Sequence, residues 1–240
     1  MANWVHPNTD RGSSIRWMFL CAVALCGMAA CVPDYEAIRG RDNQVSFPLV
    51  RGSIDLVPRR ANGLWVAAEL EASRGSGTSS QTIDAGRSTA LGGQLFTGPA
   101  QISSEFSLST QSVVLRGGTW LNPSIAFEAL GGVGSEIVTI DLRSGGVSIS
   151  DREFNLGLLA GAQLSGSPTP WLTLSGRLTG IIGLESDLET IELGAHIQVV
   201  RHLAVVGGWR KWTYREEVRS GRGPVDLSLS GPMAGIVLSF

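Results

Sequence analysis

Cysteine is absent from this chain of 240 residues after Cys31, and the other two cysteines, Cys21 and Cys26, precede it. Residues 32–240 therefore contain no disulfide, thiolate metal site or cysteine nucleophile. Charge is also sparse, because charged residues make up 17% of the chain, against roughly 25% in soluble domains. The formal net charge of −2 argues against a nucleic-acid partner, which would require a basic field.

Long apolar runs are missing, with one exception near the N-terminus. Residues 17–31, "WMFLCAVALCGMAAC", are almost entirely apolar or small and follow Arg11 and Arg16. This order of a positive segment, an apolar core and small residues is typical of an export signal. The run is shorter than the roughly 20 residues that a transmembrane helix needs. We therefore expect residues 1–31 to be a signal peptide.

The end of this signal resembles a bacterial lipobox. "MAAC", from Met28 to Cys31, places a cysteine directly after small residues, and the resemblance implies a diacylated Cys31 as the mature N-terminus. The alternative is ordinary signal-peptidase cleavage, for example after Ala29.

Residues 32–62 differ in composition from the remainder of the chain. Pro33, Pro48 and Pro58 interrupt them, and Arg39–Asp42 is a run of charge. Such composition is typical of a linker, so we predict a periplasmic tether over residues 32–62 and a folded domain over residues 63–240.

Within the folded domain, apolar and polar residues alternate with the period of two that is typical of β-strands. The alternation is clearest in four segments, residues 63–73, 154–166, 171–184 and 191–200. Each is about as long as the 9–11 residues that a tilted strand needs to cross a bilayer. Glycine, with 31 residues, is too frequent for a mostly helical domain.

The spacing of these segments predicts an all-β fold, an antiparallel barrel of about eight strands. Tight connections, such as "LNPS" after Trp120, alternate with longer polar ones over residues 74–103, 141–151 and 216–224. Short periplasmic turns and longer outer loops are typical of outer-membrane barrels. An even number of strands would place both ends of the barrel on the periplasmic side. The path of residues 74–103 is not predicted.

The chain ends on apolar residues of one parity, Ala234, Ile236, Leu238 and Phe240. In this feature it resembles the small bacterial outer-membrane β-barrels of the outer-membrane-protein-A, protein-X and opacity type. The resemblance implies location in the outer membrane, contact with its lipid, and a monomeric state. It also implies that Phe240, Leu238 and Ile236 form the insertion signal that the barrel assembly machinery recognises.

The opposite parity of the predicted strands carries charge. Its members are Glu69, Glu71, Arg116, Glu128, Arg177, Glu192, His196 and Arg210. The interior of a barrel of eight strands is only wide enough for side chains to fill it. We therefore interpret this set as an inward salt-bridge network that closes the barrel, with a gated solute path as the alternative.

Catalytic, cofactor-binding and metal-binding residues are not predicted. His196 has no serine in a His-x-Ser arrangement, the pattern carried by outer-membrane lipid A deacylases. The predicted function is non-catalytic, an envelope-structural or surface-interaction role through the outer loops. Three alternatives stay open: a narrow solute channel, a soluble lipocalin-like carrier, whose alternation would be similar, and a lipid-modifying enzyme.

Overall fold

The structure, a computed structural model, describes residues 37–42, 44–57, 63–91, 93–184, 186–217 and 223–240. The predicted signal peptide and Cys31 lie outside these residues. The strands are β1 (Ile38–Asp42), β2 (Phe47–Val57), β3 (Trp65–Ile83), β4 (Ser88–Leu91), β5 (Gln94–Thr97), β6 (Ala100–Asn122), β7 (Ile125–Ser144), β8 (Val147–Thr169), β9 (Leu172–Ile182), β10 (Ser186–Val200), β11 (Leu203–Glu216) and β12 (Val225–Ser239). No helix of sufficient length and apolarity to cross a membrane occurs in the described ranges.

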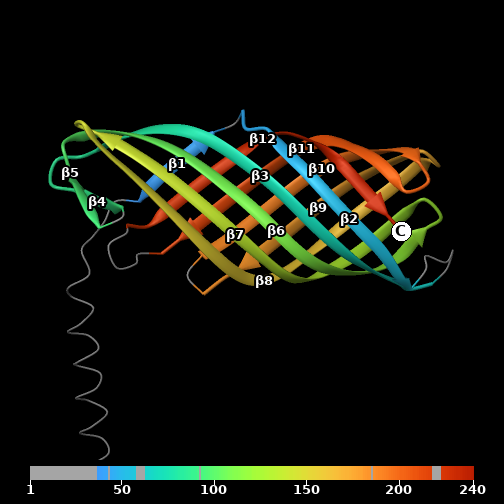
Figure 1. The fold of residues 1–240 in the computed structure, drawn as a ribbon. Coiled ribbons are helices and arrows are strands. Elements are labelled where there is room, and N and C mark those ends of the chain that lie inside the picture. Colours follow the sequence, from blue (N-terminus) through green and yellow to red (C-terminus); the bar gives the residue numbers. More distant parts are fainter. Residues whose placement is uncertain (1–36, 43, 58–62, 92, 185, 218–222) are drawn as a thin grey trace, which may run out of the picture. The chain divides into compact units, whose positions relative to one another are not determined.

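Ten of these strands form one sheet that curls into a barrel (Figure 1). Around the sheet the strands follow the order β2, β3, β6, β7, β8, β9, β10, β11 and β12, and each is antiparallel to the next. The last strand then pairs with β2 in parallel, Met233–Ser239 against Phe47–Ser53, and closes the ring. The prediction of an all-β chain is confirmed, and the sheet is mostly antiparallel.

The predicted strand number of eight is not confirmed. β1 pairs in parallel with residues 225–229 of β12, directly before the part of β12 that pairs with β2. β1 and β2 therefore lie end to end along one edge of β12, and ten strands occupy nine positions around the ring.

The odd number of positions places the first and the last residue of the barrel at opposite ends. Because β1 and β2 run parallel to β12, Ile38 lies beside Pro224 at one end of the barrel, and Phe240 lies at the other. We call these the loop end and the C-terminal end. The expectation that the first and the last strand of the barrel start and finish on the same side, the periplasmic one, is therefore wrong.

The parallel seam also corrects the predicted tether. Phe47–Val57 is a strand of the barrel, with Leu49–Asp55 paired to β3 and Phe47–Ser53 paired to β12. The amide of Phe240 donates to the carbonyl of Ser53 at 2.9 Å, which extends the seam to the last residue.

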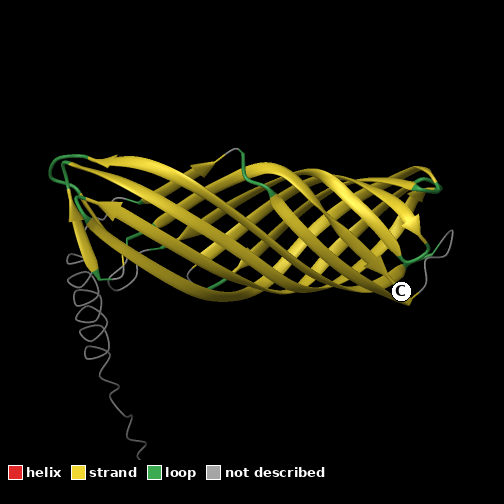
Figure 2. Ribbon diagram, turned by 45° about the horizontal axis from the view of Figure 1, so that its top comes forward, coloured by secondary structure: helices red, strands yellow, loops and turns green. Residues whose placement is uncertain are grey.

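Two segments expected as loops are largely strand. β3 continues to Ile83, β6 begins at Ala100, and only the small β4–β5 hairpin separates them. Residues 141–151 form the tips of β7 and β8, joined through Gly145 and Gly146. Both glycines have positive φ angles, 57° and 84°, the conformation that a two-residue hairpin turn requires. Most loops and turns lie at the two ends of the barrel, whereas residues 44–46, before β2, form a loop along its side (Figure 2).

Side-chain polarity is exchanged between the two halves of the barrel. Even-numbered residues of β6 face inward over almost its whole length. In the half near the C-terminal end, the inward Arg116 is buried and the outward Leu115 is exposed. In the half near the loop end, the inward Phe106 and Leu108 are buried, whereas the outward Ser103 is exposed. The same parity of β6 faces inward in both halves, but the inward residues change from charged to apolar and the outward residues from apolar to polar.

The exposed apolar side chains of the C-terminal half form a belt around the barrel, called the apolar band below. Its members are Val50, Ile54, Leu56, Leu70, Val113, Leu115, Leu121, Ile125, Phe127, Val133, Leu156, Leu158, Leu164, Leu174, Leu178, Ile182, Ile191, Leu193, Ile197, Val199, Val205 and Ile236.

The loop half encloses an apolar core instead. Phe106, Leu108, Val138 and Ile140 belong to one buried cluster. The β4–β5 hairpin adds Leu91 and Phe96 to it, and the amide of Gly223 donates to the carbonyl of Ala90 at 2.8 Å. The hairpin thus covers the loop end, where Figure 1 places it.

Candidate functional site

A layer of charged side chains crosses the interior of the C-terminal half. Five residues of the layer occupy directly paired positions on the neighbouring strands β7 to β11, namely Glu128, Gln163, Arg177, Glu192 and Arg210. All five are buried. Successive side chains of a strand point alternately inward and outward, so residues at paired positions of neighbouring strands face the same side. Each of the five strands thus contributes one inward side chain to the row. The structure therefore brings together residues that are far apart in the sequence.

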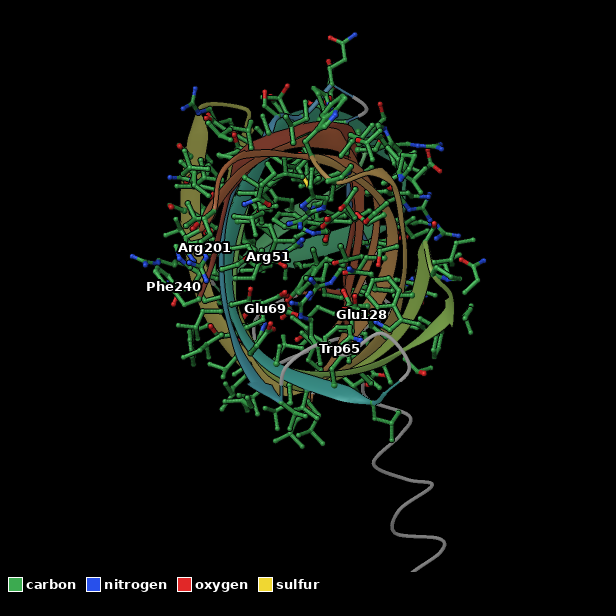
Figure 3. All side chains as sticks on the ribbon, turned by 90° about the vertical axis from the view of Figure 1, so that its right-hand side faces the viewer. Arg51, Trp65, Glu69, Glu128, Arg201 and Phe240 are labelled. Atoms are coloured by element: carbon green, nitrogen blue, oxygen red, sulfur yellow. The ribbon has the colours of Figure 1, made fainter. Side chains whose placement is uncertain are left out.

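Three more residues of the predicted set belong to the layer. Glu69 and Glu71 lie on β3, and Arg116 lies on β6. Arg51 on β2 does not, because the sequence pattern assigns β2 to the tether. Figure 3 looks along the barrel and shows Arg51, Glu69 and Glu128 pointing into its interior. With Arg51 included, the layer holds four arginines and four glutamates, so its formal charge is zero.

The contacts within the layer are close. Glu69 lies at the centre, 2.6 Å from Nη1 of Arg177, 3.2 Å from Nε of Arg116 and 3.6 Å from Nε of Arg51. Glu71 accepts from Arg51 at 2.7 Å. An isolated charge buried in this interior would be costly, whereas paired and hydrogen-bonded charges are tolerated.

Two arginines join the glutamates of neighbouring strands. Arg210 donates to Glu71 at 2.8 Å and also pairs with Glu192. Arg51 reaches Glu192 at 3.1 Å across the seam strand. Every glutamate of the layer thus has at least one arginine partner, and the eight residues form one connected network.

Aromatic rings bound this layer on both sides. The guanidinium of Arg116 lies 5.8 Å from the ring centre of Trp65, which is fully buried toward the C-terminal end. Arg210 lies 5.8 Å from the ring centre of Trp212, on which Phe47 packs edge-on at 4.8 Å. Both distances fall within the range of cation–π attraction.

A polar cavity of about 270 Å³ lies between the layer and the C-terminal end, and we call it the vestibule. Its lining consists of Arg51, Ser53, Asp55, Glu69, Arg116, Glu128, Gln163, Ser165, Thr173, Ser175, His196, Gln198, Ala204, Val237 and Ser239. On the other side of the layer, the cavity among Glu71, Arg177 and Trp212 has a volume of only about 20 Å³. The vestibule therefore ends at the charged layer.

His196 belongs to the vestibule and not to the network of charges. Its Nε2 lies 3.0 Å from Oγ of Ser175 on the neighbouring strand β9. The His-x-Ser motif requires a serine two residues after His196 in the chain, whereas the register of β9 and β10 supplies one from 21 residues away. This is the distance that a serine nucleophile and its base require.

A second buried polar cluster lies in the loop half, above the charged layer. Tyr214 donates from its hydroxyl to Glu216 at 2.7 Å and accepts from Asn155 at 3.0 Å. Burial and the nearby Glu216 raise the pKa of Tyr214, so its hydroxyl keeps its proton. Glu136 accepts from Oγ of Ser186 at 3.4 Å. Burial, together with the neighbouring Asp187, raises the pKa of Glu136 to about 7, against the effect of the Ser186 hydrogen bond.

The predicted insertion signal lies on the last strand. Ile236 and Phe240 are exposed and face outward, and Leu238 is half-buried on the same face. The ring of Phe240 stacks on His202 with centres 5.6 Å apart. The carbonyl of Phe240 accepts from the amide of Asp55 at 3.1 Å, so the final residue is held at the seam.

No cluster of three or more His, Cys, Asp and Glu residues suited to a metal ion occurs in the part of the chain that the structure describes. Comparison with family models, curated proteins and solved structures finds no match for this chain. The resemblance to small outer-membrane barrels therefore stays a prediction, and function must be argued from the barrel itself.

Proposed function

We propose that this protein is an outer-membrane β-barrel that is closed to solutes and has a non-catalytic role, structural in the envelope or in contacts at the cell surface. The observation that carries the proposal is the exchange of polarity along the strands. An exposed apolar band over a charged interior suits hydrocarbon outside. A polar wall over an apolar core suits water outside.

The dimensions of the band support the same proposal. On β6 the apolar residues of the outer face run from Val113 to Leu121, and on β7 from Ile125 to Val133, nine residues on each strand. Tilted strands need 9–11 residues to cross a bilayer. The rest of both strands would project beyond the membrane.

The turns support one orientation. At the C-terminal end, β6–β7, β8–β9 and β10–β11 are each joined by two residues, and β2–β3 is joined by residues 58–64. At the loop end, β7–β8 is also joined by two residues, but residues 84–99, which include the β4–β5 hairpin, and residues 217–224 form longer connections. Short turns are typical of the periplasmic side. The projecting half and its hairpin would then face the outside of the cell.

Closure to solutes rests on the charged layer and the core beyond it. The vestibule ends at eight interconnected charges, and the loop half is filled by buried apolar side chains. This arrangement disfavours the channel. It also disfavours a lipocalin-like carrier, because the interior beneath the exposed apolar band is charged and the apolar core lies elsewhere.

The experiment combines fractionation with conductance. We expect the full chain to sediment with outer membranes, to migrate differently on a gel before and after boiling, and to give negligible steady conductance in planar bilayers. Release as a soluble protein on osmotic shock would contradict the membrane proposal. Large and reproducible channel openings would contradict closure and favour a solute path.

The contact between Ser175 and His196 favours a second candidate, an acyl hydrolase in the vestibule. Ser175 Oγ would attack an ester carbonyl and pass its proton to His196 Nε2, which would give it to the departing alcohol as the ester C–O bond breaks. Water would then hydrolyse the acyl-serine, releasing the carboxylic acid and restoring Ser175. A fluorophosphonate probe should then label the wild type and neither Ser175→Ala nor His196→Gln. Ser165→Ala, another vestibule serine, is the matched control. Lack of labelling in the folded wild type would eliminate this candidate.

A further inference from the structure

We propose that the outer face of the barrel has a binding site for one membrane lipid. The site takes an acyl chain of the lipid in a groove across β2, β3, β6, β7 and β8, and binds the phosphate of its headgroup through Arg74. The inference rests on the proposed function, because it requires that the apolar band lies in a membrane. It adds a defined partner, whereas a uniform apolar band would contact lipids without preference.

The groove follows the edge of the apolar band that faces the loop half. It has a volume of about 510 Å³. Five of its residues occupy directly paired positions on five neighbouring strands, namely Val50, Ala72, Gln111, Ser135 and Leu156. Because neighbouring strands lie about 4.8 Å apart, this row is about 19 Å long. A site of this length suits an extended acyl chain.

The side of the groove toward the C-terminal end is apolar. Leu70, Val113 and Val133 occupy the next paired outward positions and are each about half exposed. On β2 the same level is occupied by Gly52, where a Cβ would meet no atom within 4 Å. The missing side chain leaves space between Leu70 and Leu238, which is paired with Gly52 on β12. Hydrocarbon is the occupant that this side fits.

The side of the groove toward the loop end is polar. Gln111 and Ser135 lie side by side in the row, and neither side chain forms a hydrogen bond with another residue that the structure describes. Arg74, the next outward residue of β3 after Ala72, is exposed and forms no ion pair within the described ranges. The one acidic residue on the outer faces of β3 and β6 is Glu105, which lies farther toward the loop end. Arg74 is therefore free to bind an anion.

These two sides match the two parts of a membrane lipid. The amide of Gln111 and the hydroxyl of Ser135 can donate to the ester carbonyls that join the acyl chains to the headgroup. The guanidinium of Arg74 suits a phosphate, which it can bind with two parallel hydrogen bonds. In the proposed orientation this edge of the band faces the outside, so the lipid belongs to the outer leaflet.

A second copy of the chain fits the groove less well. In a two-fold symmetric contact the same patch of each copy meets its counterpart. Such a contact centred on the groove would bring the two Arg74 side chains close together, where their charges repel. A lipid phosphate instead neutralises Arg74.

The test inserts the full chain into phosphatidylcholine vesicles. The vesicles contain a small fraction of phosphatidylglycerol that has a photoreactive group on one acyl chain. After illumination, mass spectrometry of peptides locates the label. We expect it to concentrate around Leu70 and Val113, and to be sparse around Leu193 and Val205 on strands across the barrel. Even labelling around the band would overturn the site.

Two variants test the two parts of the site, each in its heat-modifiable folded form. Gly52→Leu fills the groove and should lose most of the label around Leu70. Gly207→Leu on β11, where a Cβ also meets open space, should keep it. Arg74→Gln should weaken labelling about fivefold, the contribution expected of one arginine near an anionic lipid surface. Lys211→Gln, beside Ile191 at the same edge of the band, should leave it unchanged.

The outcomes separate this inference from the proposed function. Unchanged labelling in Gly52→Leu would overturn the groove, and unchanged labelling in Arg74→Gln would overturn recognition of the phosphate. Cross-links between two protein chains in place of lipid would assign the groove to a second copy. A chain that fails to insert into vesicles and is released by osmotic shock would instead overturn the membrane barrel on which the inference rests.

Discussion

At the scale of single residues, Glu136 is a carboxyl group whose environment opposes its ionisation. It is buried in the loop half, and its Oε1 has no hydrogen-bond partner among the described residues. Its pKa is raised from 4.5 to about 7. A group with a raised pKa in the folded state stabilises the protein fully below the pKa of the unfolded state, and this contribution is lost as pH rises toward 7.

Glu136→Gln should therefore stabilise the protein at high pH and change little at pH 4. A shift of this size corresponds to a gain of up to about 3 kcal/mol above pH 7. Urea unfolding of the solubilised protein between pH 4 and pH 8 measures it. Glu105→Gln on the exposed outer wall is the control, with no expected effect. Equal pH profiles for wild type and Glu136→Gln would mean that the pKa of Glu136 is not raised in the folded protein.

Arg177 gives a prediction for the charged layer. Arg177→Met leaves four glutamates with three arginines and removes the closest partner of Glu69, 2.6 Å away. Breaking a buried pair in this way costs about 3–5 kcal/mol. The double variant Arg177→Met with Glu69→Gln restores the balance and should cost less than the single change. Unfolding free energies in detergent test this, with Arg152→Met on the outer wall as control. Strictly additive costs would show that the two groups are not coupled.

At the scale of elements, the seam between β2 and β12 brings two backbones close together at Gly235. A side chain at Gly235 would clash with the carbonyl oxygen of Leu49 on β2, whereas one at Gly207 would meet open space. We expect Gly235→Ala to lose at least about 1–3 kcal/mol and much of its heat-modifiable folded form. Gly207→Ala, on the neighbouring β11, should keep both. Equal folded fractions on a gel would argue against the parallel closure.

Alternation alone places some residues and not others. Glu128 and Arg177 can be assigned to the inner face because apolar residues flank them on the other parity. The loop half of β3, "RGSGTSSQTI", has the composition of a loop because its outward residues are Arg, Ser and Thr and two of its inward residues are Gly75 and Gly77. Its strand character depends on packing against other strands, which hydropathy does not reveal.

Strand pairing also lies beyond what a single sequence reveals. β2 contains Pro48 and Arg51 in a mixed pattern, and its place in the barrel depends on a parallel partner almost 190 residues away. Contact between Ser175 and His196 likewise depends on the register of β9 and β10, because a slip of one residue would turn one side chain to the other face. The number of strands, and with it the side from which the chain enters, is determined by such pairings.

At the scale of the whole molecule, the two halves of the barrel suit different surroundings. The C-terminal half exposes its apolar band and encloses charge, while the loop half exposes polar residues and encloses an apolar core. β6 passes through both halves, and its outer face carries Leu115 in the first and Ser103 in the second. These two positions lie on the same strand and the same face, so they differ chiefly in the proposed contact with lipid.

An arginine at each position tests that difference. On the lipid face of an outer-membrane barrel, arginine costs about 2–4 kcal/mol at the bilayer midplane and little outside the membrane. Leu115→Arg should therefore lose about this much free energy of folding into lipid vesicles and reach the outer membrane at lower levels. Ser103→Arg should match the wild type in both. If the apolar band faced water instead, Leu115→Arg would cost no folding free energy and would raise the solubility of the protein, because an exposed leucine does not stabilise the fold. Equal folding of the two variants in vesicles would place the apolar band outside the bilayer and remove the main support for a membrane barrel.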